Sequence, residues 1–159
     1  MGVEIERKFL VTGDAWRSLG EPALLRQGYL STDPARTVRV RIENGQGVLT
    51  IKGKNSGATR GEWEYPIPVD EAAELLDTLC PAPLVEKHRT RVTVGNHVWE
   101  VDEFLGANQG LLVAEIELGA EDEIFLLPEW VGAEVTGEAR YYNSSLIKQP
   151  FTQWLEDGA

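Results

Sequence analysis

The sequence predicts a β-rich α+β protein built on a closed eight-stranded antiparallel β-barrel with a few flanking helices. Two observations lead to this prediction. Apolar and polar residues alternate with period two through most of the first 118 residues, and Gly, Pro, Asn and Asp separate these stretches at short intervals. Eight such stretches are enough to close a barrel wide enough to hold side chains or one small ligand.

Short turns join the expected strands. The pair Asn44-Gly45 favours the tight turn of a β-hairpin, because both residues adopt a positive φ at little cost. The strands delimited in this way follow one another at residues 3–11, 27–32, 37–43, 47–54, 60–67, 84–94, 97–104 and 111–118.

Helical periodicity is confined to a few places. It predicts helices at 14–19, at 70–79 and in two pieces after Pro128, which Pro150 interrupts because proline cannot continue a helix. We therefore expect a single domain over residues 1–159. Barrel strands and helix 70–79 make up residues 1–118, and a mainly helical tail makes up residues 119–159.

Composition limits the classes of protein to consider. The net charge of −11 argues against broad nucleic-acid binding, which needs a basic face to release counterions from phosphates. Cys80 is the single cysteine, so neither an intramolecular disulfide nor a thiolate zinc site is expected. The charged N-terminus lacks the apolar core of a signal peptide, which predicts a cytoplasmic protein with no membrane partner. The sequence leaves open whether the protein forms a homodimer.

Charged residues gather on one face of nearly every expected strand. Successive strand residues point to opposite faces, so the parity of the residue numbers separates the two faces. In the first strand, Glu4, Glu6 and Lys8 share a face opposite Ile5 and Phe9. The same rule collects the charged residues of the other strands: Arg39, Arg41, Lys52, Lys54, Arg60, Glu62, Glu64, Lys87, Arg89, Arg91, Glu100, Asp102, Glu115 and Glu117.

Any one of these polar faces, taken alone, is best explained as the solvated side of an antiparallel sheet. Solvated faces, however, usually mix Thr, Ser, Gln and Asn with the charges, whereas these faces consist almost entirely of carboxylates and cations. If the charged faces point inward, the interior must be wet and open to a ligand, because dry ions are costly. Helix 70–79 and the tail helices would then cover the apolar outer face. A membrane barrel is the weaker alternative, since no export signal is seen.

Both types of charge in one lumen fit phosphoryl chemistry. Arginine and lysine side chains bind the oxygens of a phosphate chain. Carboxylates spaced at i and i+2 suit Mg²⁺ or Mn²⁺, hard cations that prefer oxygen ligands and bridge to substrate phosphates. The pattern therefore predicts a metal-assisted reaction of a polyphosphate.

The sequence Glu4-Ile5-Glu6-Arg7-Lys8 matches ExExK, the signature of the CYTH superfamily of triphosphate tunnel metalloenzymes, which the chain resembles over nearly its whole length. The resemblance implies an eight-stranded tunnel, a triphosphate substrate and a divalent metal, Mg²⁺ or Mn²⁺. Members of this family include inorganic tripolyphosphatases, thiamine triphosphatases, class IV adenylate cyclases and RNA 5′-triphosphatases. The match continues in order through Arg39-Val40-Arg41, Thr50-Ile51-Lys52, Glu62-Trp63-Glu64, Val85-Glu86-Lys87, Glu100-Val101-Asp102 and Glu115-Ile116-Glu117.

The resemblance also implies roles for individual side chains. The expected triphosphate ligands are Lys8, Arg39, Arg41, Lys52, Lys87 and Arg89, and Lys54 and Arg60 are added to them because they share the inward parity. The expected metal ligands are Glu4, Glu6, Glu115 and Glu117, and Glu62, Glu64 and Asp102 are expected to complete the metal set or to support its ligands. The expected catalytic set combines metal-holding carboxylates with lysines that stabilise developing charge: Glu4, Glu6, Lys8, Lys52, Lys87, Glu115 and Glu117.

The leading hypothesis is metal-dependent hydrolysis of inorganic tripolyphosphate to pyrophosphate and phosphate. The compact segment Arg26-Gln27-Gly28-Tyr29-Leu30 resembles small bacterial tripolyphosphatases, and it lacks the longer tyrosine-rich segment of the cyclase and thiamine triphosphatase branches. The alternatives are a nucleoside or thiamine triphosphatase, a class IV-like adenylate cyclase, or a non-catalytic sensor that binds polyphosphate or a nucleotide.

Overall fold

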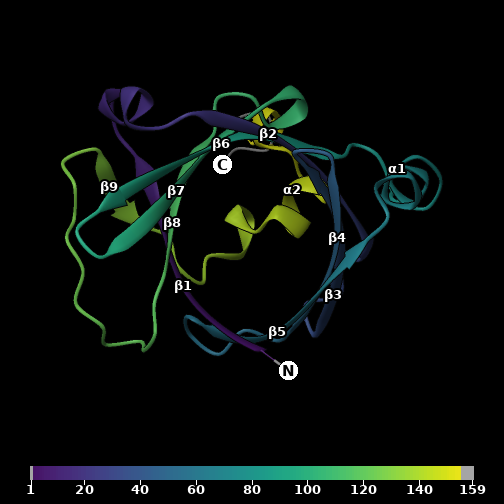
Figure 1. Ribbon diagram of the computed structural model, residues 1–159, viewed down its shortest axis with the longest axis horizontal. Helices are drawn as coiled ribbons and strands as arrows, with labels where there is room; N and C mark the ends of the chain where they lie inside the picture. The colour runs from purple at the N-terminus through teal and green to yellow at the C-terminus, as the bar shows by residue number, and fades with distance from the viewer. Residues whose placement is uncertain (1, 155–159) are drawn as a thin grey trace.

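The computed structural model describes residues 2–154, and its strands form a closed antiparallel barrel (Figure 1). The strands follow the order β5-β4-β3-β2-β6-β7-β8-β1, and β1 pairs again with β5 to close the ring. The predicted eight-stranded barrel is confirmed. Its strands are β1 (Gly2–Val11), β2 (Pro22–Ser31), β3 (Arg36–Glu43), β4 (Gln46–Gly53), β5 (Thr59–Ile67), β6 (Val85–Val94), β7 (His97–Phe104) and β8 (Leu112–Glu117).

Turn chemistry and strand boundaries agree with the sequence except at β2. Asn44 has a φ of 51° and Gly45 a φ of 72°, as the predicted tight hairpin turn requires. Strand β2 begins at Pro22 rather than at residue 27, and its first residues pair with β6. The adjacent leucines Leu24 and Leu25 break the period-two pattern, so periodicity does not predict this part of the strand.

A ninth strand, β9 (Val131–Glu134), lies beside the second half of β1. The sequence predicts only helices after Pro128 and does not predict this strand. Strand β5 pairs only with the start of β1, and β9 takes up the same edge from Phe9 onward. A strand this short offers too few residues to reveal its period. The helices of the described chain are η1 (Ala15–Leu19), α1 (Val69–Thr78), η2 (Gly106–Asn108), η3 (Ala139–Tyr141), α2 (Asn143–Lys148) and η4 (Phe151–Gln153).

Two apolar clusters cover the outside of the barrel. Helix α1 packs Leu76 against Val40 of β3, as its amphipathic pattern predicts. On the far side, Trp16 of η1 and Trp130, which precedes β9, pack in the cluster around the fully buried Trp99 of β7. None of the helices in the described part of the chain combines the length and the apolarity needed to cross a membrane.

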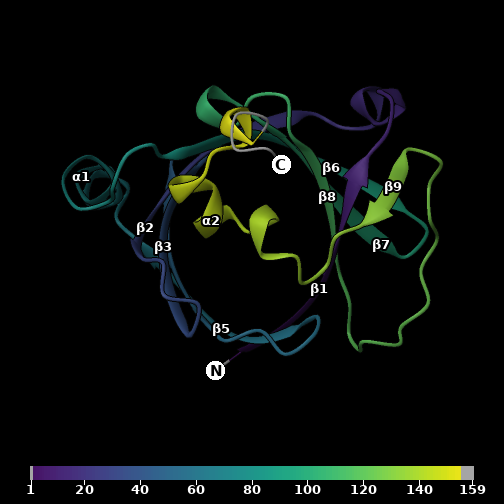
Figure 2. The same ribbon diagram turned by 180° about the vertical axis from the view of Figure 1, so that it is seen from behind.

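The C-terminal segment fills one end of the barrel. Figures 1 and 2 show α2 inside the ring of strands from both directions. Leu146 and Ile147 of α2, with Trp154, pack against Val85 and Val113, which share inward parity with the charged residues of their strands. The prediction that the tail helices cover the outer face is therefore wrong, because this inner end of the barrel is itself apolar and needs a cover.

Replacing Leu76 by Ala should destabilise the fold by about 2–5 kcal/mol, because the side chain is only 2% exposed and its loss leaves a cavity under α1. Leu79, at the end of the same helix, is 63% exposed, and Leu79→Ala should change stability by about 0.5 kcal/mol or less. Urea unfolding of the two variants measures the difference. Equal losses would contradict this packing of α1.

Candidate active site

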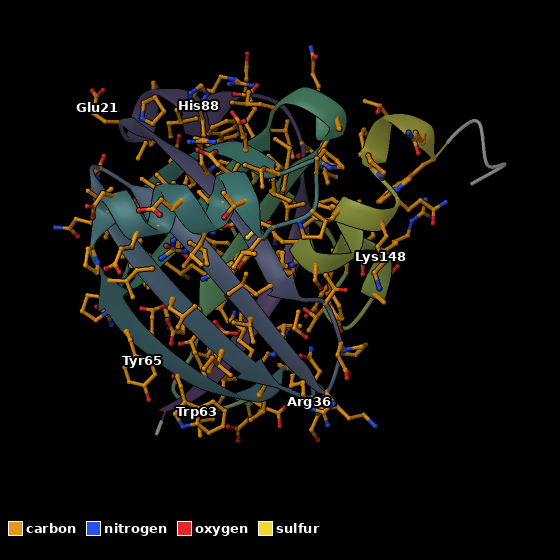
Figure 3. The ribbon with its side chains drawn as sticks, turned by 90° about the vertical axis from the view of Figure 1, so that its right-hand side faces the viewer. Glu21, Arg36, Trp63, Tyr65, His88 and Lys148 are labelled. Atoms are coloured by element: carbon orange, nitrogen blue, oxygen red, sulfur yellow. The ribbon has the colours of Figure 1, made fainter. Side chains whose placement is uncertain are left out.

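A polar cavity of about 260 Å³ occupies the inside of the barrel. All of the site residues predicted from the sequence line it except Lys54 and Asp102. Strand parity accounts for this result: β5 turns Glu62 and Glu64 inward, while Trp63 and Tyr65 lie on the outside (Figure 3). Lys54 is exposed and follows the last residue of β4, where strand parity no longer applies.

Asp102 lies buried behind the cavity wall and joins two basic residues. Its Oδ1 accepts a hydrogen bond from Arg89 Nε at 2.8 Å, and its Oδ2 accepts from Arg89 Nη2 at 2.9 Å and lies 2.7 Å from Lys87 Nζ. Burial would raise the pKa of Asp102, but Arg89 and Lys87 hold it below the ordinary value. Both oxygens are engaged and the residue is 0% exposed, so Asp102 anchors these cations from behind the wall, which agrees with the expected supporting role and not with that of a cavity-lining metal ligand.

Basic residues of β3 and β6 form one wall of the cavity, the basic wall, which consists of Arg39, Arg41, Lys87 and Arg89. Burial, followed by repulsion from the neighbouring Arg39 and Arg89, lowers the pKa of Arg41 to about 10. Burial likewise lowers the pKa of Lys87 to about 8, against the attraction of Asp102. The Nε atoms of Arg39 and Arg41 are buried without a hydrogen-bond partner. Such a crowded set of donors suits a polyanion, which would satisfy the donors and relieve their repulsion.

Carboxylates of β1, β5 and β8 form the opposite wall, the carboxylate wall. The Glu6 side chain lies within hydrogen-bond reach of Glu115, and Glu4 within reach of Glu62. Burial and the nearby carboxylates raise the pKa of Glu6 well above its ordinary value and that of Glu62 to about 7. Burial, followed by repulsion from Glu4, also raises the pKa of Glu117. The fold therefore holds several carboxylates close together, and their repulsion when ionised lowers the stability of the folded protein.

The carboxylate wall fits a divalent cation in its chemistry. Hard cations prefer carboxylate oxygens, and a cation between these groups would remove the repulsion that raises their pKa values. Lys52 supplies part of the compensation, since its Nζ lies 2.9 and 3.0 Å from the two oxygens of Glu4. Within residues 2–154, no three carboxylate, His or Cys side chains already converge as a metal-binding group, so a cation would draw the two carboxylate pairs together.

The C-terminal segment contributes cavity residues that strand parity did not predict. Lys8 Nζ donates to the carbonyl oxygen of Tyr141 at 3.3 Å, and Asn55 Nδ2 donates to the hydroxyl of Tyr142 at 3.1 Å. Asn143 Oδ1 accepts a hydrogen bond from Lys87 Nζ at 3.0 Å. These tail residues follow the last barrel strand, where the strand period no longer assigns residues to a face. The further lining residues include Tyr29, Thr37, Thr50, Arg91, Glu100, Thr136, Gly137 and Ser144.

Asp102→Asn should destabilise the protein by about 3–5 kcal/mol, because it leaves two buried cations without their carboxylate. The neighbouring Glu103 pairs with Arg17 at the surface, so Glu103→Gln should cost about 1 kcal/mol or less. Since the folded state lowers the pKa of Asp102 below 3.8, its stabilising effect is complete above about pH 3.8 and is lost as the pH falls. Acid unfolding of the Asn variant should accordingly lack this loss. Equal stability of the two variants would contradict the anchor role.

Comparison with known proteins places the barrel and its cavity in one family. Residues 2–149 match the model of the CYTH domain. The chain is 51% identical to an inorganic triphosphatase of Acetivibrio thermocellus over 98% of this chain and 100% of that protein, and 36% identical to an inorganic triphosphatase of Nitrosomonas europaea over 90% and 95%. The crystal structure of the inorganic triphosphatase NE1496 superposes with a TM-score of 0.63, at 33% identity over 90% of this chain and 96% of that one. The chain belongs to the CYTH domain family.

Proposed function

We propose that the protein hydrolyses inorganic triphosphate to pyrophosphate and phosphate with the help of a divalent cation, Mg²⁺ or Mn²⁺. The observation that supports this most directly is the cavity, which sets a basic wall opposite a carboxylate wall inside one closed barrel. The two relatives named as inorganic triphosphatases match almost the whole chain, which favours the same activity here.

The basic wall binds and orients the substrate in this proposal. Arg39 and Arg41 have buried guanidinium donors without protein partners, so phosphate oxygens can fill those positions. Lys87 and Arg89 are held in place by Asp102, so they are already positioned before the substrate binds. Their charges stabilise the negative charge that develops on the departing pyrophosphate.

The carboxylate wall would hold the cation through Glu4, Glu6, Glu62, Glu115 and Glu117. A bound Mg²⁺ or Mn²⁺ supplies charge neutralisation on the phosphoryl oxygens and orients the water that attacks the terminal phosphorus. In that reaction a bond forms between the water oxygen and phosphorus, and the phosphoanhydride bond to pyrophosphate breaks. Lys52, which bridges the carboxylate wall to the substrate side, limits repulsion between the carboxylates and the phosphates.

The composition of the chain supports an inference about its compartment and its substrate class. We infer a cytoplasmic enzyme that acts on a small-molecule triphosphate and not on nucleic acid. A reducing compartment suits the free thiol of Cys80, and a net charge of −11 disfavours a nucleic-acid partner.

A substrate panel tests the activity. Phosphate release should be fastest with tripolyphosphate, slower with ATP and slowest with thiamine triphosphate, and it should require Mg²⁺ or Mn²⁺. Glu117→Gln should reduce this release at least about 100-fold, because it removes a charged ligand at the reacting end of the substrate. Glu129→Gln, at an exposed position outside the cavity, is the matched control. Preference for thiamine triphosphate, formation of cyclic AMP from ATP, or binding without turnover would each replace the proposed activity.

Thermal stability tests the cation site without turnover. A Glu62 pKa of about 7 exceeds the ordinary 4.5, so the folded protein binds this proton more tightly and loses stability as the pH rises from about 4.5 to 7. A cation binds the ionised carboxylates, so Mg²⁺ should raise Tm more at pH 7.5 than at pH 5. Differential scanning calorimetry of the protein and of Glu62→Gln, whose Tm should rise less with Mg²⁺, measures this. An equal rise at both pH values would contradict carboxylate ligation.

A further inference from the structure

Asn143, the first residue of α2, lies where the C-terminal segment meets the basic wall. Its Oδ1 accepts two hydrogen bonds, from Lys87 Nζ at 3.0 Å and from Gln27 Nε2 at 2.9 Å. Lys87 is itself held by Asp102 and is 1% exposed, so it cannot turn away from Asn143 into solvent. One amide oxygen thus joins α2 to β6 and β2.

These contacts fix which way the Asn143 amide faces. If the group were turned over, its NH₂ would face an ammonium and another NH₂, both of which are donors. Turning Gln27 does not help, because its oxygen would then face the Asn143 oxygen. The structure instead leaves Gln27 Oε1 buried without a partner, which proteins usually avoid. The presence of that orphan acceptor shows that the contacts to Asn143 Oδ1 decide the arrangement of both amides.

The orientation leaves the nitrogen of the Asn143 amide without a partner in the described protein. Asn143 lines the cavity beside Lys87. Across residues 2–154, Asn143 Nδ2 donates to no protein acceptor, and it is not one of the buried unpartnered atoms, so we infer that it faces the cavity that Asn143 lines. An amide nitrogen has two N–H donors, and oxygens of a bound phosphate are the acceptors that the basic wall would bring next to it.

We propose that Asn143 is a substrate-binding residue whose Nδ2 donates to an oxygen of the phosphate held by Lys87. This inference rests on the proposed function for the identity of the ligand. A neutral donor suits this position because a further cation would face Lys87, with Arg89 also close by. Leu146 and Ile147 seat α2 in the apolar end of the barrel, so the fold of the C-terminal segment places this donor.

Calorimetric titration with tripolyphosphate in EDTA tests the donor, since removal of divalent cations prevents turnover. Asn143→Ala should weaken binding by about tenfold to hundredfold, the effect of losing a hydrogen bond to a charged group. The loss should be the same at low and high salt, because the amide is neutral. Asn143→Asp keeps an acceptor for Lys87 and Gln27 but lacks the N–H donors, and it should weaken binding at least as much. Ser145→Ala, on the same helix but outside the cavity, should bind like the parent.

An NMR measurement separates a ligand from a mere support for Lys87, because weaker binding by Asn143→Asp also follows from its added negative charge. Parent-like affinity of Asn143→Asp, or of Asn143→Ala, would overturn the proposal. ¹⁵N NMR of the parent protein provides a second test, for which a variant is needed only to assign the resonances. The Asn143 side-chain amide resonances should shift downfield when tripolyphosphate is added. Unchanged resonances would overturn the proposal. Phosphate release is assayed separately with Mg²⁺ or Mn²⁺. A parent that binds tripolyphosphate but releases no phosphate would sink the proposed hydrolysis and leave the Asn143 contact standing.

Discussion

Strand β1 closes the barrel, and the active-site cavity depends on how it pairs. Its first half hydrogen bonds to β5, and its second half bonds to β8 on one edge and β9 on the other. This double pairing brings Glu4 beside β5, and Glu6 directly opposite Glu117 of β8. Carboxylates from three strands thereby meet on one wall, where none of the three strands alone would create a site.

Closure has an electrostatic consequence that shapes the rest of the site. Buried like charges raise or lower one another's pKa values, and the barrel separates them into a basic wall and a carboxylate wall instead of pairing them all. Asp102 is the exception, because its carboxylate neutralises part of the positive charge of Lys87 and Arg89 from behind the basic wall and so stabilises that wall. The remaining imbalance on the two walls is what a polyanion and a cation would each relieve.

The C-terminal segment covers the apolar end of the barrel interior. Inward-facing positions change from charged to apolar along the strands, as from Lys87 to Val85 on β6 and from Glu115 to Val113 on β8. The apolar end receives α2 and Trp154, while the polar start of α2 reaches the cavity. The same short segment therefore completes the core and contributes to the site, which couples the packing of the chain's end to the geometry around Lys87.

The sequence by itself determined the barrel and most of the cavity lining, because a period of two assigns each strand residue to one face, and charged faces that point inward require a wet lumen. It could not identify β9, which is too short to show a period, or the place of α2. Nor could it separate Asp102 from its neighbours, since parity reports the face of a residue and not its depth. Only the tertiary structure decided that Asp102 lies behind Lys87 and Arg89, and that Asn143 contacts Lys87 at the cavity. Those positions depend on strand closure and on the packing of the tail, which join residues distant in sequence.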